Sequence, residues 1–283
     1  MRRILHLMRS SRTLTHTAAW PTCALGAWGA ARLTGRCSPD DVIAALAESA
    51  DRHTVLHEEA GDTTDSGNGV LELLSILRPA RGLAVRLPST GDPQGLPPHP
   101  ATSKALLASE VLLVDEGDTA GTLALVPELD TFDTDPPYVL CRWSVLRYDT
   151  RLDLGHLLTA GPSAGDLEYE LRQAVAEATT IIGGLGNRRS VDLADLRKDL
   201  AARTARHRVD LPPHSLDARS TRLIDTAAQV EAIVDLAVAR GVEVGDTAGQ
   251  WDSGDSALRR LQSLTRAARA AAVNHTIGEL LRD

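Results

Sequence analysis

Residues 138–148 read Tyr138-Val-Leu-Cys-Arg-Trp-Ser-Val-Leu-Arg-Tyr148, and this stretch decides the fold. It is rich in the β-branched and aromatic side chains that favour strands. After Asp149 the apolar residues change to helical spacing and keep it through the rest of the sequence. We therefore predict strands in the first half only and a helical second half.

Four shorter segments before this stretch are also expected to be strands. We predict strands at 53–59, 83–87, 111–115 and 122–126, and helices at 21–33, 39–50, 70–77 and 101–109. The helix at 39–50 has the clearest start, because Ser38 is a good N-cap and Pro39 fits the first helical position. Together these elements predict a small, mostly antiparallel sheet with flanking helices.

The second half is expected to hold about four amphipathic helices. Apolar residues recur at helical spacing in the segments 166–182, 193–200, 220–240 and from 255 onward. Asp166 is the expected cap of the first of these helices, and Gly183-Gly184 its expected end. In the last helix the apolar stripe loses its phase after His275, which predicts a bend or fraying there.

The predicted fold class is therefore α+β, in two parts. An α+β domain is expected at 1–150 and a helical domain at 151–283. The junction between them, at 149–165, is short. This leaves open whether the two parts share one core.

Composition limits the classes of function. The chain has 283 residues, a net charge of −8 and 3% aromatic residues. General nucleic-acid binding needs a broad positive surface, and base stacking needs aromatic platforms, so we expect neither. The cysteines are odd in number and widely spaced, which argues against a disulfide framework or a zinc site and fits a reducing cytoplasm. No apolar run is long enough to span a membrane.

The first residues, Met1-Arg-Arg-Ile-Leu-His-Leu-Met-Arg9, look like the beginning of a signal peptide. Their apolar stretch is too short for one, and Arg9 and Arg12 interrupt it. We expect an ordered or frayed first segment instead, with Met8 as an alternative start. The expected location of the protein is the cytoplasm.

The strongest candidate for a functional segment is the loop Leu87-Pro-Ser-Thr-Gly-Asp-Pro-Gln-Gly-Leu-Pro-Pro-His-Pro100. Its prolines restrict the backbone and reduce the entropy that is lost on ordering. One interpretation is the preformed lip of a binding cleft, with Asp92 and Gln94 presented to a ligand and Asp92 or His99 as an acid or base. The other interpretation is a stiff crossover that covers one edge of the sheet.

Several motif-like stretches lack the context that their chemistry requires. Gly161-Pro-Ser-Ala-Gly165 matches a nucleophile elbow, but it has no convincing strand before it and no strands after it. His53-Thr-Val-Leu-His57 places two imidazoles on one face without a complete metal site, so we expect solvated histidines. The remaining stretches are two Asp-rich ones that do not match a calcium loop and a glycine-rich one that follows a helix instead of a strand, at 62–69, 130–135 and 183–189. We predict no catalytic set, no metal and no cofactor.

The last helix carries a group of arginines, namely Arg259, Arg260, Arg266 and Arg269. A helical wheel places Arg259 and Arg266 opposite the apolar stripe, with Arg269 beside them, so we expect a solvated face. This face is also a candidate for docking on an acidic partner or on a phosphate backbone. His275 lies on the apolar side and is expected in the core or in an interface.

Four stretches of the sequence resemble a known family. They are Arg86-Leu-Pro-Ser-Thr-Gly-Asp-Pro-Gln-Gly-Leu-Pro97, Ala108-Ser-Glu-Val-Leu-Leu-Val114, Leu125-Val-Pro-Glu128 and Cys141-Arg-Trp-Ser-Val145. They are similar to uncharacterised proteins of high-GC actinobacteria, and the resemblance extends over residues 25–240. It implies a cytoplasmic protein from a GC-rich genome and implies no particular activity.

The sequence leads to two functional hypotheses. The first is a non-catalytic cytoplasmic protein that binds a protein partner or forms a homo-oligomer through its helical region, because amphipathic helices need partners for their apolar faces. The alternative is a small-molecule-binding protein or enzyme whose cleft is walled by the loop at 87–100.

Overall fold

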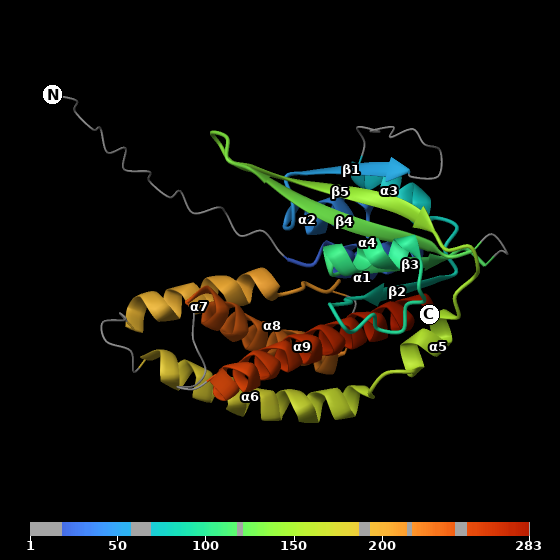
Figure 1. Ribbon diagram of the computed structural model, residues 1–283. Helices are drawn as coiled ribbons and strands as arrows, with labels where there is room; N and C mark the ends of the chain where they lie inside the picture. Colours follow the sequence, from blue (N-terminus) through green and yellow to red (C-terminus); the bar gives the residue numbers. More distant parts are fainter. Residues whose placement is uncertain are drawn as a thin grey trace.

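The strands form one mixed sheet (Figure 1). The structure is a computed structural model that describes residues 19–57, 69–117, 121–186, 193–213, 217–240 and 248–282. Its strands are β1 (Arg52–His57), β2 (Gly82–Arg86), β3 (Val111–Asp115), β4 (Leu123–Phe132) and β5 (Tyr138–Arg147), in the spatial order β1-β5-β4-β3-β2. β1 pairs with β5 in parallel, and the other neighbours are antiparallel. The prediction of an α+β fold with a mostly antiparallel sheet is confirmed.

Helices from the first half flank this sheet. They are α1 (Pro21–Leu33), α2 (Pro39–Ala47), α3 (Gly69–Leu77) and α4 (Pro100–Ala108). α2 begins as the sequence predicts, with a capping box in which the Ser38 hydroxyl accepts from the Asp41 N–H and the Asp41 carboxylate accepts from the Ser38 N–H. α1 approaches the sheet closely at Gly26, where a Cβ atom would lie 3.0 Å from Val85 of β2.

The second half of the described chain is helical. It contains α5 (Leu154–Thr159), α6 (Ala164–Gly186), α7 (Leu193–His207), α8 (Ala218–Ala239) and α9 (Ala248–Arg282). α9 packs on α8, α6 and α1, and it also reaches β2 (Figure 1). The sequence does not predict α5, because this helix is too short for its apolar residues to show a helical period.

The sheet is buried on both faces, because consecutive residues of its strands are apolar and their side chains point to opposite faces in turn. In β3, Leu112 and Val114 belong to a large hydrophobic cluster, and Val111 and Leu113 belong to a smaller one. The large cluster joins the sheet to α1, α6, α8 and α9, and the smaller one joins it to α4 and α5. Residues from both halves of the chain therefore share the large cluster, and a domain boundary at residue 150 stays a prediction.

Some predicted boundaries in the middle of the chain are wrong. β4 continues to Phe132, well beyond residue 126, because its long hairpin with β5 supplies backbone partners to residues of low strand propensity. α6 runs through Gly183 and Gly184 to Gly186. Asp166 is not the cap of α6: the Ser163 hydroxyl accepts a hydrogen bond from the Asp166 N–H (3.2 Å), so Ser163 caps the helix.

The start and end of the last helix also differ from the prediction. α9 begins at Ala248 and stays helical past His275 to Arg282, so the predicted fraying after His275 is wrong, and the alternative of a bend there stays a prediction. The side chain of His275 is 48% exposed and does not belong to the core. The reason is that α9 lies among several neighbours, so a single apolar stripe does not describe which of its residues are buried.

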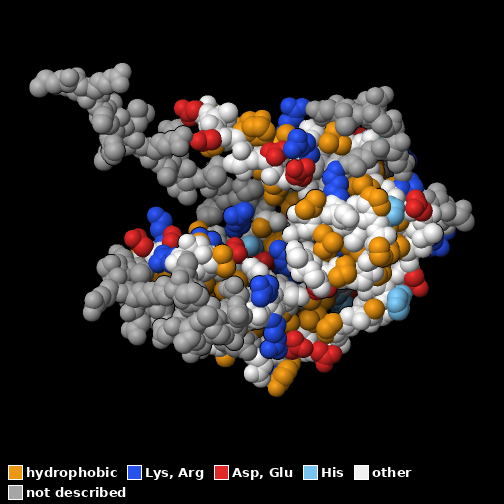
Figure 2. All heavy atoms as spheres, viewed as in Figure 1, with side chains coloured by type: hydrophobic (Ala, Val, Ile, Leu, Met, Phe, Trp, Pro, Cys, Tyr) orange, Lys and Arg blue, Asp and Glu red, His pale blue; other side chains and the backbone are white. Residues whose placement is uncertain are grey.

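None of the helices that the structure describes is both long and apolar enough to cross a membrane. All three cysteines are free, and Cys23 and Cys141 are buried. Acidic and basic side chains are interspersed over the face shown in Figure 2.

Candidate functional site

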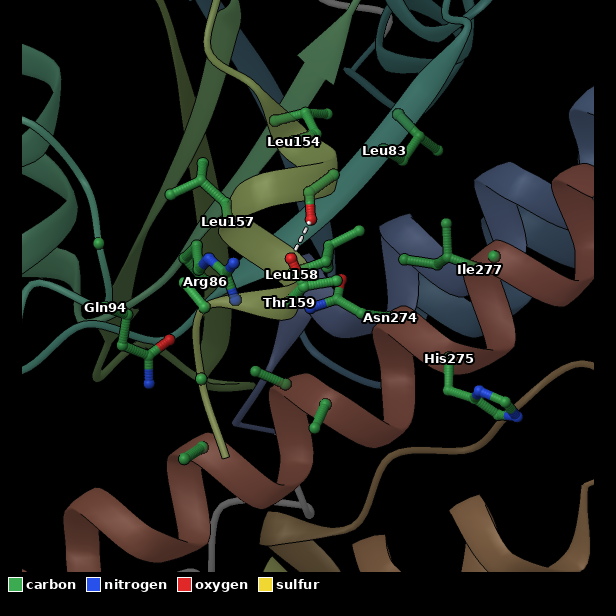
Figure 3. Close-up of a pocket in the computed structure, with 18 of the residues that line it drawn as sticks. Leu83, Arg86, Gln94, Leu154, Leu157, Leu158, Thr159, Asn274, His275 and Ile277 are labelled. Carbon is green, nitrogen blue, oxygen red and sulfur yellow. Dashed lines mark hydrogen bonds between the residues drawn. The ribbon is translucent and has the colours of Figure 1, made fainter. Parts of the chain in front are cut away.

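A cleft of about 1120 Å³ opens along the edge of β2 (Figure 3). Its walls come from β2, the loop at 87–100, α5 and α9, with a small contribution from α6. β2 is the last strand in the spatial order, so no further strand of the described residues pairs with this edge. α5 and α9 belong to the clusters on opposite faces of the sheet, and the space between them at the edge is the cleft.

Asn274 of α9 covers part of the β2 edge. Its side-chain amide accepts a hydrogen bond from the Val85 N–H (2.7 Å) and donates one to the Val85 carbonyl (2.9 Å). The side chain thus takes the place of a neighbouring strand for one residue of β2. The Leu87 N–H donates to Gln94 Oε1 (2.8 Å), so the loop covers the next backbone group along the edge.

The loop at 87–100 brings two of the predicted site residues, Asp92 and Gln94, to the cleft. Asp92 Oδ1 accepts from the Gln94 N–H (3.0 Å), and Asp92 Oδ2 accepts from the Ser263 hydroxyl (3.0 Å). Gln94 has a positive φ of 51°, which lets its side chain turn back toward β2. Their polar atoms hold the loop on α9 and on β2, and their contact with a ligand stays a prediction.

His99 does not line the cleft. Its Nδ1 accepts from the Ala101 N–H (3.1 Å) at the start of α4, and its ring lies 4.7 Å from the ring of Tyr148. Its Nε2 lies 3.6 Å from the Asp149 carboxylate. The structure thus places His99 as the cap of α4, and it does not bring His99 together with Asp92 and Gln94 in the cleft.

Arg86 is the cleft residue that sequence reasoning missed. It is 8% exposed, and its Nε and Nη2 atoms are buried without a hydrogen-bond partner in the described part of the chain. Burial lowers the pKa of Arg86, but an arginine remains charged at neutral pH. A signal was available, because the two-residue alternation of a strand places Arg86 on the same side as the buried Ala84.

Basic side chains outnumber acidic ones around the cleft. Arg81, Arg86 and Arg282 line it, and Asp92 is the carboxylate among the described lining residues. Both oxygens of Asp92 already accept hydrogen bonds. The remaining lining is mostly apolar, so the cleft combines hydrophobic walls with a positive charge.

Two of the arginines of α9 are not on a solvated face, which corrects the prediction for Arg266 and Arg269. Arg269 is fully buried, its guanidinium lies 4.4 Å from the ring centroid of Trp20, and its Nη1 lies 2.6 Å from Glu231 Oε2. Arg266 donates to the carbonyls of Pro88 (3.3 Å) and Ser109 (3.2 Å). Arg259 and Arg260 are exposed, as predicted.

A buried carboxylate accepts hydrogen bonds from the first turn of α1. Glu110 Oε2 accepts hydrogen bonds from the N–H (3.0 Å) and the hydroxyl of Thr22. Burial raises the pKa of Glu110 from 4.5 to about 7, and the Thr22 donors and the charges of Arg266 and Arg269 oppose this rise. Glu110 is therefore a group whose ionisation changes near neutral pH.

Stability is expected to fall as the pH rises through neutrality, since the pKa of Glu110 is higher in the folded state than in the unfolded state. The contribution of Glu110 is fully present below pH 4.5, and it is lost as the pH passes 7. Between pH 4.5 and 8 the loss amounts to about 3 kcal/mol. Urea unfolding of the wild type and of Glu110→Gln at several pH values measures this loss of stability. The variant should lack the part of the pH dependence that is due to Glu110. Identical pH profiles would show that Glu110 is not its source.

The two histidines at 53 and 57 contact different partners. His53 is buried, its Nε2 lies 3.1 Å from the Leu46 carbonyl oxygen, and its Nδ1 accepts from the Trp143 indole N–H (3.1 Å), so the expectation of a solvated histidine is wrong for it. His57 Nε2 lies 2.8 Å from a carboxylate oxygen of Glu72. No group of metal-ligating side chains occurs among the described residues.

The other motif-like stretches have structural positions or lie outside the described residues. Ser163 caps α6, and the Asp-rich stretch at 130–135 lies at the end of the β4–β5 hairpin. Residues 62–68 and 187–189 lie outside the description, as does the segment before residue 19, with Met8.

The chain matches a known family in both halves. Residues 22–154 match the family described as Rv1486c-like protein, N-terminal domain, and residues 165–270 match Rv1486c-like protein, C-terminal domain. The uncharacterised protein Rv1486c of Mycobacterium tuberculosis is 31% identical over 286 residues, which cover 89% of this chain and 96% of that protein. The uncharacterised protein ML1804 of Mycobacterium leprae is 28% identical over 289 residues, covering 90% and 96%.

Similarity also extends to the uncharacterised protein MAV321 of Mycobacterium avium, which is 28% identical over 256 residues, covering 80% of this chain and 81% of that protein. No solved structure matches significantly. The resemblance to uncharacterised actinobacterial proteins is confirmed by these matches. The chain belongs to the Rv1486c-like family.

Proposed function

We propose that this protein binds a small molecule with an anionic group in the cleft along β2. The observation that carries the proposal is Arg86, a buried charge whose Nε and Nη2 atoms have no partner within the described residues and which lines a large cleft. Leaving a charged donor buried and unpaired is costly, so buried charges in native structures are paired or hydrogen-bonded. An anion in the cleft would supply a counter-charge for this guanidinium.

The chemistry of the cleft favours a carboxylate or a phosphate. A guanidinium presents its donors in a planar fork that matches two oxygens of either group. Arg81 and Arg282 add positive charge at the cleft, and Asp92 is occupied by its own hydrogen bonds. The proposal concerns binding and includes no reaction.

Butyrate and inorganic phosphate are the probes for this proposal. Each is expected to raise the Tm of the wild type, because a ligand that binds the folded state alone stabilises it. Arg86→Met keeps an apolar stem and removes the charge, so its Tm should not rise. Arg260→Met removes an exposed arginine that does not line the cleft, and it should respond as the wild type does. An equal rise in wild type and Arg86→Met, or no rise in the wild type, would contradict the proposal.

Self-association through the helical region stays a prediction. It rested on unpartnered helix faces, and the apolar residues of α6, α8 and α9 pack within the chain, where they join the large hydrophobic cluster. The fold therefore gives this hypothesis less support than it gives to small-molecule binding. We propose the cytoplasm as the site of action, because the cysteines are free.

A further inference from the structure

The apolar part of the cleft is extended. α5 contributes Leu154, Leu157 and Leu158, β2 contributes Leu83, and α9 contributes Ile277 and Leu281. In Figure 3, Arg86 is seen between Gln94 on one side and Leu158 and Ile277 on the other. The apolar side chains thus continue beyond the guanidinium instead of surrounding it evenly.

Small residues of α9 keep this apolar part open. Ala267, Ala270, Ala271 and Gly278 line the cleft, and Gly278 leaves room for a further carbon atom, which would meet nothing closer than Arg282 at 3.9 Å. A volume of about 1120 Å³ is also larger than a small anion such as acetate or phosphate needs. Pockets for drug-sized ligands occupy roughly 300–1000 Å³.

We infer that the cleft takes a single-chain anionic amphiphile, with its head group on Arg86 and its hydrocarbon chain along α5 and α9. This inference rests on the proposed function and adds the chemistry of the ligand. The head group is a carboxylate or a phosphate, because Arg86 brings a guanidinium to the cleft lining and burial is the one influence on its pKa, with no carboxylate beside it in the described chain. The rest of the ligand is a hydrocarbon chain, because the leucines of α5 and Ile277 offer a ligand no hydrogen-bonding group.

Chain length provides the first test. The affinities of butyrate, decanoate, decyl phosphate and 1-decanol are measured by calorimetry on the full chain, below the concentrations at which the probes form micelles. Burial of each methylene group strengthens binding about fourfold at most, so we expect decanoate to bind at least about 100-fold more tightly than butyrate. Decyl phosphate should resemble decanoate, and 1-decanol should bind much more weakly because it lacks the charge.

Variants separate the head group from the chain. Arg86→Met is expected to bind decanoate no more tightly than 1-decanol. Leu158→Gln changes a 41% exposed leucine of the cleft wall, so the fold should tolerate it, and we expect decanoate to bind about tenfold more weakly while butyrate is unaffected. Leu107→Gln is the matched control: this leucine of α4 is 88% exposed and does not line the cleft, so both affinities should stay unchanged.

The outcomes distinguish this inference from the proposed function. If decanoate binds no more tightly than butyrate, and both need Arg86, the amphiphile is ruled out and anion binding stands. If none of butyrate, decanoate, inorganic phosphate and decyl phosphate binds, the proposed function itself is wrong. If Arg86→Met leaves the affinity for decanoate unchanged, the head group does not sit on Arg86 and both proposals fail.

Discussion

Replacing Arg269 with methionine is expected to lower the free energy of unfolding by about 3–5 kcal/mol, because it leaves a buried carboxylate without its partner. The side chains of Arg269 and Glu231 are 0% and 4% exposed, and their charged atoms lie 2.6 Å apart. The variant also loses the stacking of the guanidinium on Trp20, at 4.4 Å. Urea unfolding at neutral pH measures the loss.

Two controls identify the cause of that loss. Arg259→Met removes an exposed arginine from the same helix and should change stability by less than about 0.5 kcal/mol. The double variant Arg269→Met/Glu231→Leu removes both charges and should recover most of the stability, since apolar replacements of a buried pair are often neutral. A single variant as stable as the wild type would show that the pair is not needed.

The second large effect is expected for Asn274→Leu. This change removes both partners of the Val85 backbone, whose N–H and carbonyl then stay buried without a hydrogen bond. Each unsatisfied group costs about 1–3 kcal/mol, so we expect the free energy of unfolding to fall by about 2–6 kcal/mol. Loss of this cover should also speed amide hydrogen exchange at Val85 more than at Leu112, which lies within the sheet.

Asn274→Asp tests the geometry of this contact. The carboxylate keeps an acceptor for the Val85 N–H but loses the donor to the Val85 carbonyl. The free energy of unfolding of Asn274→Asp should therefore lie between those of the wild type and Asn274→Leu. The neighbouring His275 is exposed, and His275→Ala should have little effect on stability. Equal stabilities of wild type and Asn274→Leu would contradict the role assigned to Asn274.

Elements with a strong local signal could be predicted from the sequence. α1 and β3 have the predicted bounds, and α2 has the predicted start. Caps, prolines and apolar alternation act over a few residues, so one segment carries its own information. β4 was predicted too short because its outer part is held by pairing with β5 and has no apolar pattern of its own.

The cleft could be predicted only in part. The loop at 87–100 was recognised from its prolines and glycines, and Asp92 and Gln94 do line the cleft. The contact between Val85 and Asn274 joins residues 189 positions apart, and no local pattern indicates it. A helical wheel also cannot tell a face that meets solvent from one that meets another helix, which is why Arg269 was misplaced.

The contact between Asn274 and Val85 can form only after α9 has been synthesised. The strand that it completes precedes it by 189 positions, so during synthesis the β2 edge stands open while the intervening chain is made. Until α9 arrives, the sheet exposes backbone groups that another polypeptide could pair with, and such unfinished edges are prone to aggregation. A nascent chain of this protein thus completes its sheet late, and the helix that completes it also forms a wall of the cleft.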